Sequence, residues 1–108
     1  MSDGAGLGEF EQLVLLAILN LGPAAHAIEI RARIESAALR RVSRGALYAT
    51  LDRLKEKGFI SYRVAEGGEE REGRPKRYYS IENAGRQALI EAEHARHSLV
   101  PNLKSALA

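Results

Sequence analysis

The sequence predicts a mainly α-helical domain with a small β-hairpin, which places it in the α+β class. Three observations lead to this prediction. Apolar residues recur at helical spacing in three consecutive segments of the first half of the chain. Two stretches of strand composition then flank a glycine-rich charged segment, and the last segment returns to helical spacing. A chain of 108 residues is expected to form one domain.

The first eight residues, MSDGAGLG, are rich in glycine and are expected to be flexible. A first helix is predicted from about Glu9 to Leu21, and the pair Gly22-Pro23 ends it. Its side chains are apolar nearly all round, and such a helix must be covered on more than one side. In a chain this small, a second subunit could supply one of the covering surfaces.

A second helix is predicted over Ala27–Ala38, followed by a short basic connection over residues 39–42. Ser43 is a typical N-cap for a third helix that extends to about Lys57. The buried stripe of this third helix has the spacing i, i+4, i+7 and consists of Leu47, Leu51 and Leu54. Gly58 follows as the glycine that ends the helix.

Two strands are predicted next, over Phe59–Val64 and Arg77–Ile81. The segment between them, Ala65–Lys76, is charged, contains three glycines and one proline, and is not expected to form regular structure. The two strands should therefore pair as a hairpin. Its loop is called the wing.

A last helix is predicted from about Glu82 to at least Val100, and Pro101 should kink it or begin a second piece. Its apolar residues recur at roughly helical spacing and include Leu89, Ala92, Leu99 and Leu103. The predicted order of elements is three helices, a hairpin with a wing, and one more helix. This order is typical of a winged helix-turn-helix with an appended helix. We expect this domain over residues 9–81, with an appended C-terminal dimerisation helix over residues 82–108.

Positive charge is concentrated in the second half of the predicted domain. The formal net charge is only +2, but the segment from Arg40 to Arg63 has seven bases and two acids, a net charge of +5. The segment from Arg71 to Arg77 has four bases and one acid, a net charge of +3. Such clustering is typical of a surface that binds phosphates. Composition alone leaves a solvated basic surface equally open.

Catalytic and metal chemistry are poorly supported. The chain has no cysteine, which excludes disulfides and cysteine-based metal sites. His94 and His97 could share a helix face but lack a clear third ligand, so a solvated polar face is favoured over a metal site. Ser43 has no histidine base nearby in the sequence, and the pair Gly67-Gly68 lacks the spacing of a nucleotide-binding loop. We therefore expect no enzyme activity, no cofactor and no metal.

Nothing in the sequence indicates a membrane protein. The longest apolar run, Leu13–Leu19, is far shorter than the about 20 residues that span a bilayer. The N-terminus has no basic start followed by an apolar stretch and a cleavage site. A soluble, cytoplasmic protein is expected.

The third helix and the wing carry the residues expected to bind double-stranded DNA. An α-helix fits the major groove and contacts bases with its N-terminal residues, here Ser43, Arg44, Gly45, Tyr48 and Ala49. Tyr48 could instead be a half-buried core tyrosine. Arg53 and Lys57, further along the helix, are better placed for phosphates. In the wing, Arg74, Lys76 and Arg77 present three cations to phosphates or to a narrow minor groove.

A homodimer is expected from the apolar surfaces of the first and last helices. Pairing them across a two-fold axis would bury both. The candidate interface residues are Phe10, Leu13, Val14, Leu89, Ala92, Leu99 and Leu103. The small residues Ala88, Ala92 and Ala95 would let the helices approach closely, or leave room for a small-molecule effector between the subunits.

Several motifs resemble the PadR family of bacterial transcriptional regulators. They are LYATLDRLKEKGFI, the glycine-containing charged loop, GRPKRYYSI and ENAGRQAL, in which Gly85 matches a glycine of the family's next helix. The resemblance covers about residues 9–100, and chain length suggests the branch with a single C-terminal helix. The family commonly has a Gly-Tyr pair and a proline where this chain has His26-Ala27 and Ser43-Arg44-Gly45. Some relatives stack planar ligands on a tryptophan, which this chain lacks.

The resemblance implies a homodimeric winged helix-turn-helix protein that represses promoters by binding a palindromic operator. It also implies that the C-terminal helix packs against the partner's N-terminal helix, which agrees with the apolar first helix. The alternative is a winged-helix module for protein–protein interaction without a DNA function. The local charges of +5 and +3 argue against it.

Overall fold

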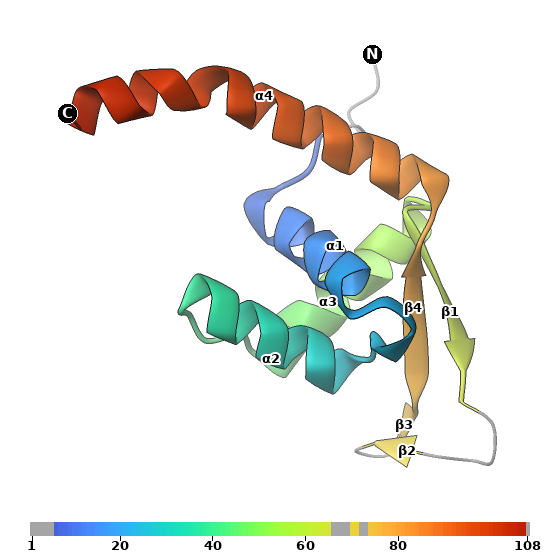
Figure 1. Ribbon diagram of the computed structural model, residues 1–108. Helices are drawn as coiled ribbons and strands as arrows, with labels where there is room; N and C mark the ends of the chain where they lie inside the picture. The colour runs from blue at the N-terminus through green and yellow to red at the C-terminus, as the bar shows by residue number, and fades with distance from the viewer. Residues whose placement is uncertain (1–5, 66–69, 72–73, 108) are drawn as a thin grey trace.

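The computed structural model describes residues 6–65, 70–71 and 74–107. Four helices and a long hairpin make up the fold, which confirms the predicted α+β class (Figure 1). In chain order the elements are α1 (Glu9–Leu21), the 3₁₀ turn η2 (Gly22–Ala24), α2 (Ala27–Ala38), α3 (Arg44–Glu56), β1 (Ile60–Val64), β2 (Glu70–Arg71), β3 (Arg74–Pro75), β4 (Arg77–Ile81) and α4 (Asn83–Leu107). The bounds predicted for α1, α2 and β4 are confirmed.

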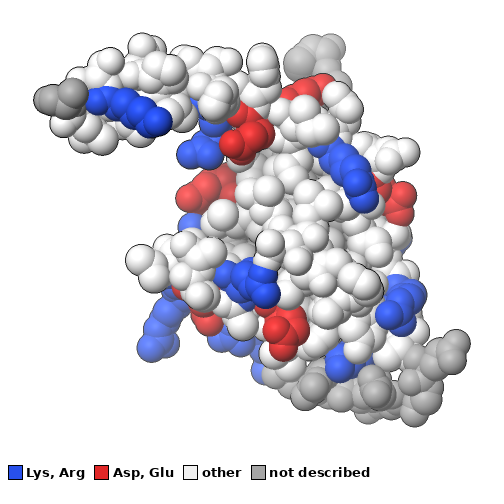
Figure 2. Space-filling model, in the orientation of Figure 1, with Lys and Arg blue, Asp and Glu red and all other residues white. Residues whose placement is uncertain are grey.

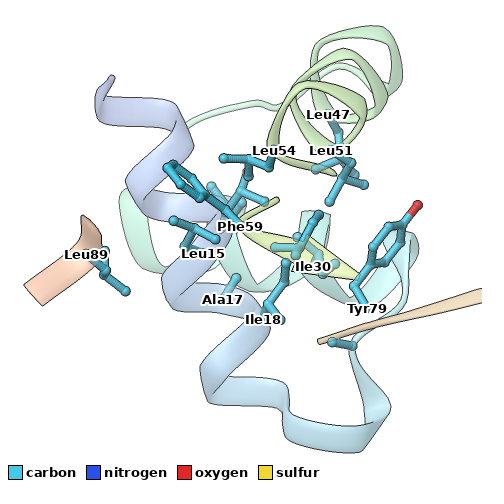
Figure 3. Packing of buried hydrophobic residues seen from close by; sticks show 14 of the residues in the cluster. Leu15, Ala17, Ile18, Ile30, Leu47, Leu51, Leu54, Phe59, Tyr79 and Leu89 are labelled. Carbon is cyan, nitrogen blue, oxygen red and sulfur yellow. The ribbon is translucent and has the colours of Figure 1, made fainter. Parts of the chain in front are cut away.

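Helix α1 lies at the centre of the molecule and contacts α2, α3, β4 and α4. This arrangement confirms that α1 is covered on more than one side. Its fully buried residues, Val14, Leu15 and Ile18, meet Ile30 of α2 and the leucines of α3 in one core (Figure 3). Leu16 and Leu19, by contrast, remain exposed on the outer side of α1.

The stripe predicted for α3 is confirmed, because Leu47, Leu51 and Leu54 are all buried in this core. The turn before α3 is held by two hydrogen bonds to the backbone of Val42. Arg31 Nε donates to its carbonyl at 2.7 Å, and its N–H donates to Glu35 Oε2 at 2.8 Å. Ser43 Oγ then accepts from the backbone N–H of Ala46 at 3.0 Å, so the predicted N-cap is also confirmed. These contacts fix where α3 begins.

One residue in the α2–α3 turn has an unfavourable backbone conformation. Leu39 has φ 54° and ψ 46°, in the left-handed region, and its side chain is 89% exposed. A leucine gains no burial there to offset the cost of this conformation, whereas asparagine tolerates it. We expect Leu39→Asn to raise the free energy of unfolding by about 0.5–1 kcal/mol. Urea denaturation would measure the gain, and a loss of stability would show that Leu39 packs on something in solution.

The hairpin pairs β1 with β4 as antiparallel strands, with Tyr62 opposite Tyr79 and Arg63 opposite Tyr78. The backbone N–H of Tyr79 also donates to the carbonyl of Ala25 at 2.7 Å, which ties β4 to the segment before α2. The wing is more regular than predicted. β2 pairs with β3 as a second pair of antiparallel strands, in a segment that was predicted from the sequence to be irregular loop.

Helix α4 begins directly after β4 and crosses above α1 (Figure 1). The backbone N–H of Glu82 donates to the carbonyl of Phe59 at 2.8 Å, which joins the start of α4 to the start of β1. The helix is continuous to Leu107, so Pro101 does not begin a second piece. Its C-terminal half extends beyond the rest of the molecule (Figure 1).

Two residues predicted at a subunit interface lie in the core of their own subunit. Val14 is fully buried and Leu89 nearly so, because α4 covers α1 within the same chain. Neither side chain has surface left for a second subunit, and both are corrected to core positions. Phe10, Leu13 and Ala92 are half-buried, whereas Leu99 and Leu103 are exposed.

Candidate nucleic-acid interface

The N-terminal half of α3 presents a small, exposed surface. Ser43, Arg44, Gly45 and Ala49 are all exposed, on the side of α3 away from its buried leucine stripe. No atom lies within 4 Å of the position that a Cβ on Gly45 would occupy. The surface therefore lets another molecule approach the α3 backbone closely, as the major groove of DNA requires.

Tyr48 joins this surface to the base of the wing. Its side chain is half-buried and packs against the core. It also lines a hollow of about 20 Å³ together with His26, Lys76, Arg77 and Tyr79. A hollow of this size holds about one water molecule. The position agrees with the alternative of a half-buried tyrosine, and it still places Tyr48 between α3 and the wing.

Aromatic rings hold the cations of the hairpin. The guanidinium of Arg77 lies 4.4 Å from the ring centroid of Tyr62, and that of Arg63 lies 4.4 Å from the ring of Tyr78. The ammonium of Lys76 lies 5.4 Å from the same Tyr78 ring. Contacts of this kind stabilise a cation by about 0.5–1 kcal/mol at an exposed site. The side chain of Arg74 lies outside the described residues, although its backbone belongs to β3.

The hydroxyl oxygen of Tyr79 accepts a hydrogen bond from the Arg77 guanidinium. Burial raises the pKa of Tyr79, and the hydrogen bond and charge of Arg77 only partly oppose the effect. The contribution of Arg63, Tyr62 and Tyr78 to the surface was not predicted from the sequence. Strand alternation could have placed Arg63 and Tyr78 on one face, but only the register makes them neighbours.

Arg53, predicted as a phosphate contact, pairs with a carboxylate of α1. Its Nε lies 3.3 Å from Glu11 Oε2, and Lys57 Nζ lies 3.0 Å from the same oxygen. Glu11 Oε1 accepts from the backbone N–H of Gly8 at 2.9 Å. Burial alone would raise the pKa of Glu11, but these hydrogen bonds outweigh it and lower the pKa below its ordinary value. This network could not be predicted from the sequence, since Glu11 and Lys57 are 46 residues apart.

A second carboxylate of the same helical turn forms a similar contact. Glu9 Oε1 accepts from Arg40 Nη1 at 3.0 Å, and the guanidinium of Arg40 lies 5.4 Å from the ring centroid of Phe10. At least three of the seven bases between Arg40 and Arg63 are therefore paired with acids of α1. Their charge is less available to a ligand than the sequence count indicates.

Comparison with known protein families identifies the chain. The model of the transcriptional regulator PadR-like family matches residues 15–91, which span α1 to the first part of α4. The chain belongs to the PadR-like family. Its members are regulators of transcription, so this protein is a DNA-binding regulator, and the resemblance found in its sequence motifs is confirmed.

Solved structures of similar proteins agree with this assignment. A PadR-like transcription factor from Bacteroides fragilis is 28% identical, with a TM-score of 0.68 over 90% of this chain and 88% of that one. A transcriptional regulator from Clostridium thermocellum shares the fold at 18% identity, with a TM-score of 0.72 over 98% and 96%. A PadR family regulator from Eggerthella lenta also shares it at 22% identity, with a TM-score of 0.67 over 92% and 86%. None of the curated proteins compared with this PadR-like chain matches it.

Other kinds of site are not found in the part of this PadR-like protein that the structure describes. Residues 6–65, 70–71 and 74–107 contain no group of three or more His, Cys, Asp or Glu that could hold a metal ion. Across the same ranges, no helix combines the length and apolar character needed to cross a membrane.

Proposed function

We propose that this PadR-like protein is a homodimeric repressor that binds a palindromic operator. Helix α3 would enter the major groove as the recognition helix, with Arg44, Gly45 and Ala49 facing base edges. Lys76 and Arg77 at the base of the wing would contact the flanking phosphates. The observation that carries the proposal is the exposed, sterically open N-terminal half of α3 beside the cations at the base of the wing.

The apolar surface of α4 supports the dimer. Ala88, Ala92, Leu99 and Leu103 share one face of the helix, because their spacings of four and seven residues return to nearly the same angle. Within the subunit this face is buried at Ala88 and half-buried at Ala92, but it is 64% exposed at Leu99 and 58% exposed at Leu103. A second copy of the chain would complete its burial.

The surface that lies below α4 in the space-filling view is suited to such a contact. It is mostly neither acidic nor basic, and most charged side chains in this view lie toward its edges (Figure 2). Leu16 and Leu19 of α1 add exposed apolar area to the molecule. A dimer built on α1 and α4 would hold two recognition helices in a two-fold arrangement, which a palindromic operator with half-sites about one DNA turn apart would match.

Repression would follow from occupancy of a site that overlaps a promoter. This part of the proposal rests on the family resemblance. Ala92 and Ala95 have small side chains on α4, which would leave room for a small-molecule effector between the subunits or let the two helices approach closely. Selection of bound fragments from the source genome with purified protein would reveal the operator, its symmetry and its half-site spacing together.

Arg44→Ala tests whether α3 is the recognition helix. If its guanidinium donates two hydrogen bonds to a guanine, the substitution should weaken binding to the selected operator by about 1–3 kcal/mol. Binding to random duplex DNA should change much less. Fluorescence anisotropy on both duplexes at several salt concentrations would measure the difference. Equal losses on the two duplexes would mean that Arg44 contacts only phosphate.

A further inference from the structure

Glu11 is a buried acid that links α1 to the C-terminal end of α3. It belongs to α1, yet it binds two cations of the recognition helix, Arg53 and Lys57. Its own side chain is only 9% exposed. The carboxylate is therefore part of the α1–α3 contact and is screened by solvent less than a surface charge would be.

The hydrogen bonds of Glu11 keep it in this place. One carboxylate oxygen accepts from the backbone N–H of Gly8, and the other accepts from both cations. Arg53 is also held by its own helix, because Nη2 donates to Thr50 Oγ1 at 3.2 Å. The guanidinium of Arg53 is thus directed toward α1 in the free protein.

Both cations can nevertheless reach solvent. The side chain of Arg53 is 52% exposed and that of Lys57 is 26% exposed. Arg53 lies in the last turn of α3 and Lys57 is its C-cap residue. Both are beyond the part expected to contact bases, where the phosphates that line the groove are the nearest anions. A DNA phosphate and the Glu11 carboxylate are therefore alternative partners for the same two side chains.

We infer that Glu11 competes with DNA phosphates for Arg53 and Lys57 and thereby limits the sequence-independent part of DNA binding. Phosphate contacts strengthen binding to every sequence alike, whereas base contacts distinguish the operator. Holding back two cations therefore lowers the affinity for the operator and for random DNA alike, and leaves the base contacts of Arg44 intact. The inference rests on the proposed DNA-binding role of α3.

Glu11→Gln is the variant that tests the competition. Glutamine keeps the size of the side chain and an oxygen that accepts from Gly8, but it lacks the charge that holds the cations. We expect the variant to bind random duplex DNA roughly 3–10-fold more tightly near 0.1 M salt. The salt slope, which is the slope of the logarithm of the affinity against the logarithm of the salt concentration, should be steeper by about one to two units. Because phosphate contacts do not depend on sequence, operator affinity should rise by a similar factor, and the ratio of operator affinity to random-DNA affinity should stay unchanged.

Two further variants separate the competition from other effects. Glu56→Gln removes an exposed acid from the same end of α3 and should change the salt slope by much less than one unit. Arg53→Ala should change the slope of the wild-type protein only slightly, because Arg53 is already held by Glu11. In the Glu11→Gln background, Arg53→Ala should remove about one unit of slope. This last comparison measures the coupling directly.

Each other outcome overturns the inference. An unchanged slope in Glu11→Gln, or a tighter affinity that Arg53→Ala does not reverse, would exclude competition for this cation. A lower Tm with equal losses on operator and random DNA would show that Glu11 only joins α1 to α3. If the Glu11→Gln variant does not fold, Arg53→Ala in the wild-type protein still tests the inference. A salt slope lower by one full unit in that variant would contradict the competition. If the wild-type protein binds neither the operator nor random duplex DNA, the proposed DNA-binding function itself fails. This result differs from a failure of the competition alone, in which the wild-type protein still binds DNA.

Discussion

Replacing Gly85 with alanine is expected to lower the free energy of unfolding by about 3 kcal/mol. Gly85 is buried in the first turns of α4. A Cβ at this position would lie 2.3 Å from the carbonyl oxygen of Phe59 and 3.1 Å from Ile81 Cγ1. The nearer atom is backbone, so it cannot move aside as the end of a flexible side chain would. Either α4 or the start of β1 must shift.

The sign of this effect makes the prediction specific. Helix propensity alone favours alanine over glycine by about 1 kcal/mol inside a helix. Gly45→Ala in α3 is the matched control, because nothing lies within 4 Å of the added Cβ. We expect Gly45→Ala to be neutral or stabilising, whereas Gly85→Ala should lower Tm by more than about 10 °C. Calorimetry at one fixed protein concentration would compare them. Equal effects would mean that α4 does not pack tightly on the hairpin in solution.

The helices and the hairpin could be predicted because their signals are local. Gly22-Pro23 ends α1, Ser43 caps α3, and a run of strand residues follows Gly58. Such signals act within a few residues of the chain. The short β2–β3 ladder was missed because the segment that contains it, Ala65–Lys76, is rich in charge and glycine, which is typical of a loop. Pro101 was expected to kink α4 or to begin a second piece, and its residue type alone did not exclude the second piece, which the continuous helix rules out.

The candidate site was predicted less completely because its contacts link distant parts of the chain. Residue types correctly placed Arg44 and Gly45 on the exposed side of α3. They did not show that Glu11 pairs with Arg53 across 42 residues, so the count of available positive charge was too high. Burial was also ambiguous. An apolar residue on α4 can face its own core, as Leu89 does, or solvent, as Leu99 does, and helical spacing alone does not distinguish them.

Two charges at Leu99 and Leu103, the exposed residues of the apolar face of α4, should separate the proposed dimer into monomers. In the variant Leu99→Glu/Leu103→Glu, two carboxylates would have to enter an apolar interface, which is costly without partners. Both positions lie beyond Gly85, Ala88 and Leu89, where α4 is buried in its own subunit, so each subunit should remain folded. Deleting residues 88–108 would be a poorer test, because it also removes core side chains.

Loss of the dimer should weaken operator binding on the order of 100-fold or more. When two recognition helices are joined, the second half-site is bound from a high effective concentration, and a monomer loses this advantage. Its affinity for an isolated half-site should fall only through the long-range effect of the two added charges, which high salt removes. Analytical ultracentrifugation would give the oligomeric state at micromolar concentration, and anisotropy on full and half operators would give the two affinities.

The control places the same two charges on the opposite face of α4. His97→Glu/Ser105→Glu adds two carboxylates at exposed positions that point away from Leu99 and Leu103. It should leave the dimer intact and reduce DNA binding only through long-range charge, which high salt removes. A wild-type protein that is monomeric at micromolar concentration, yet binds its operator tightly, would contradict the dimer. So would a Leu99→Glu/Leu103→Glu variant that still sediments as a dimer, because α4 would then not form the contact.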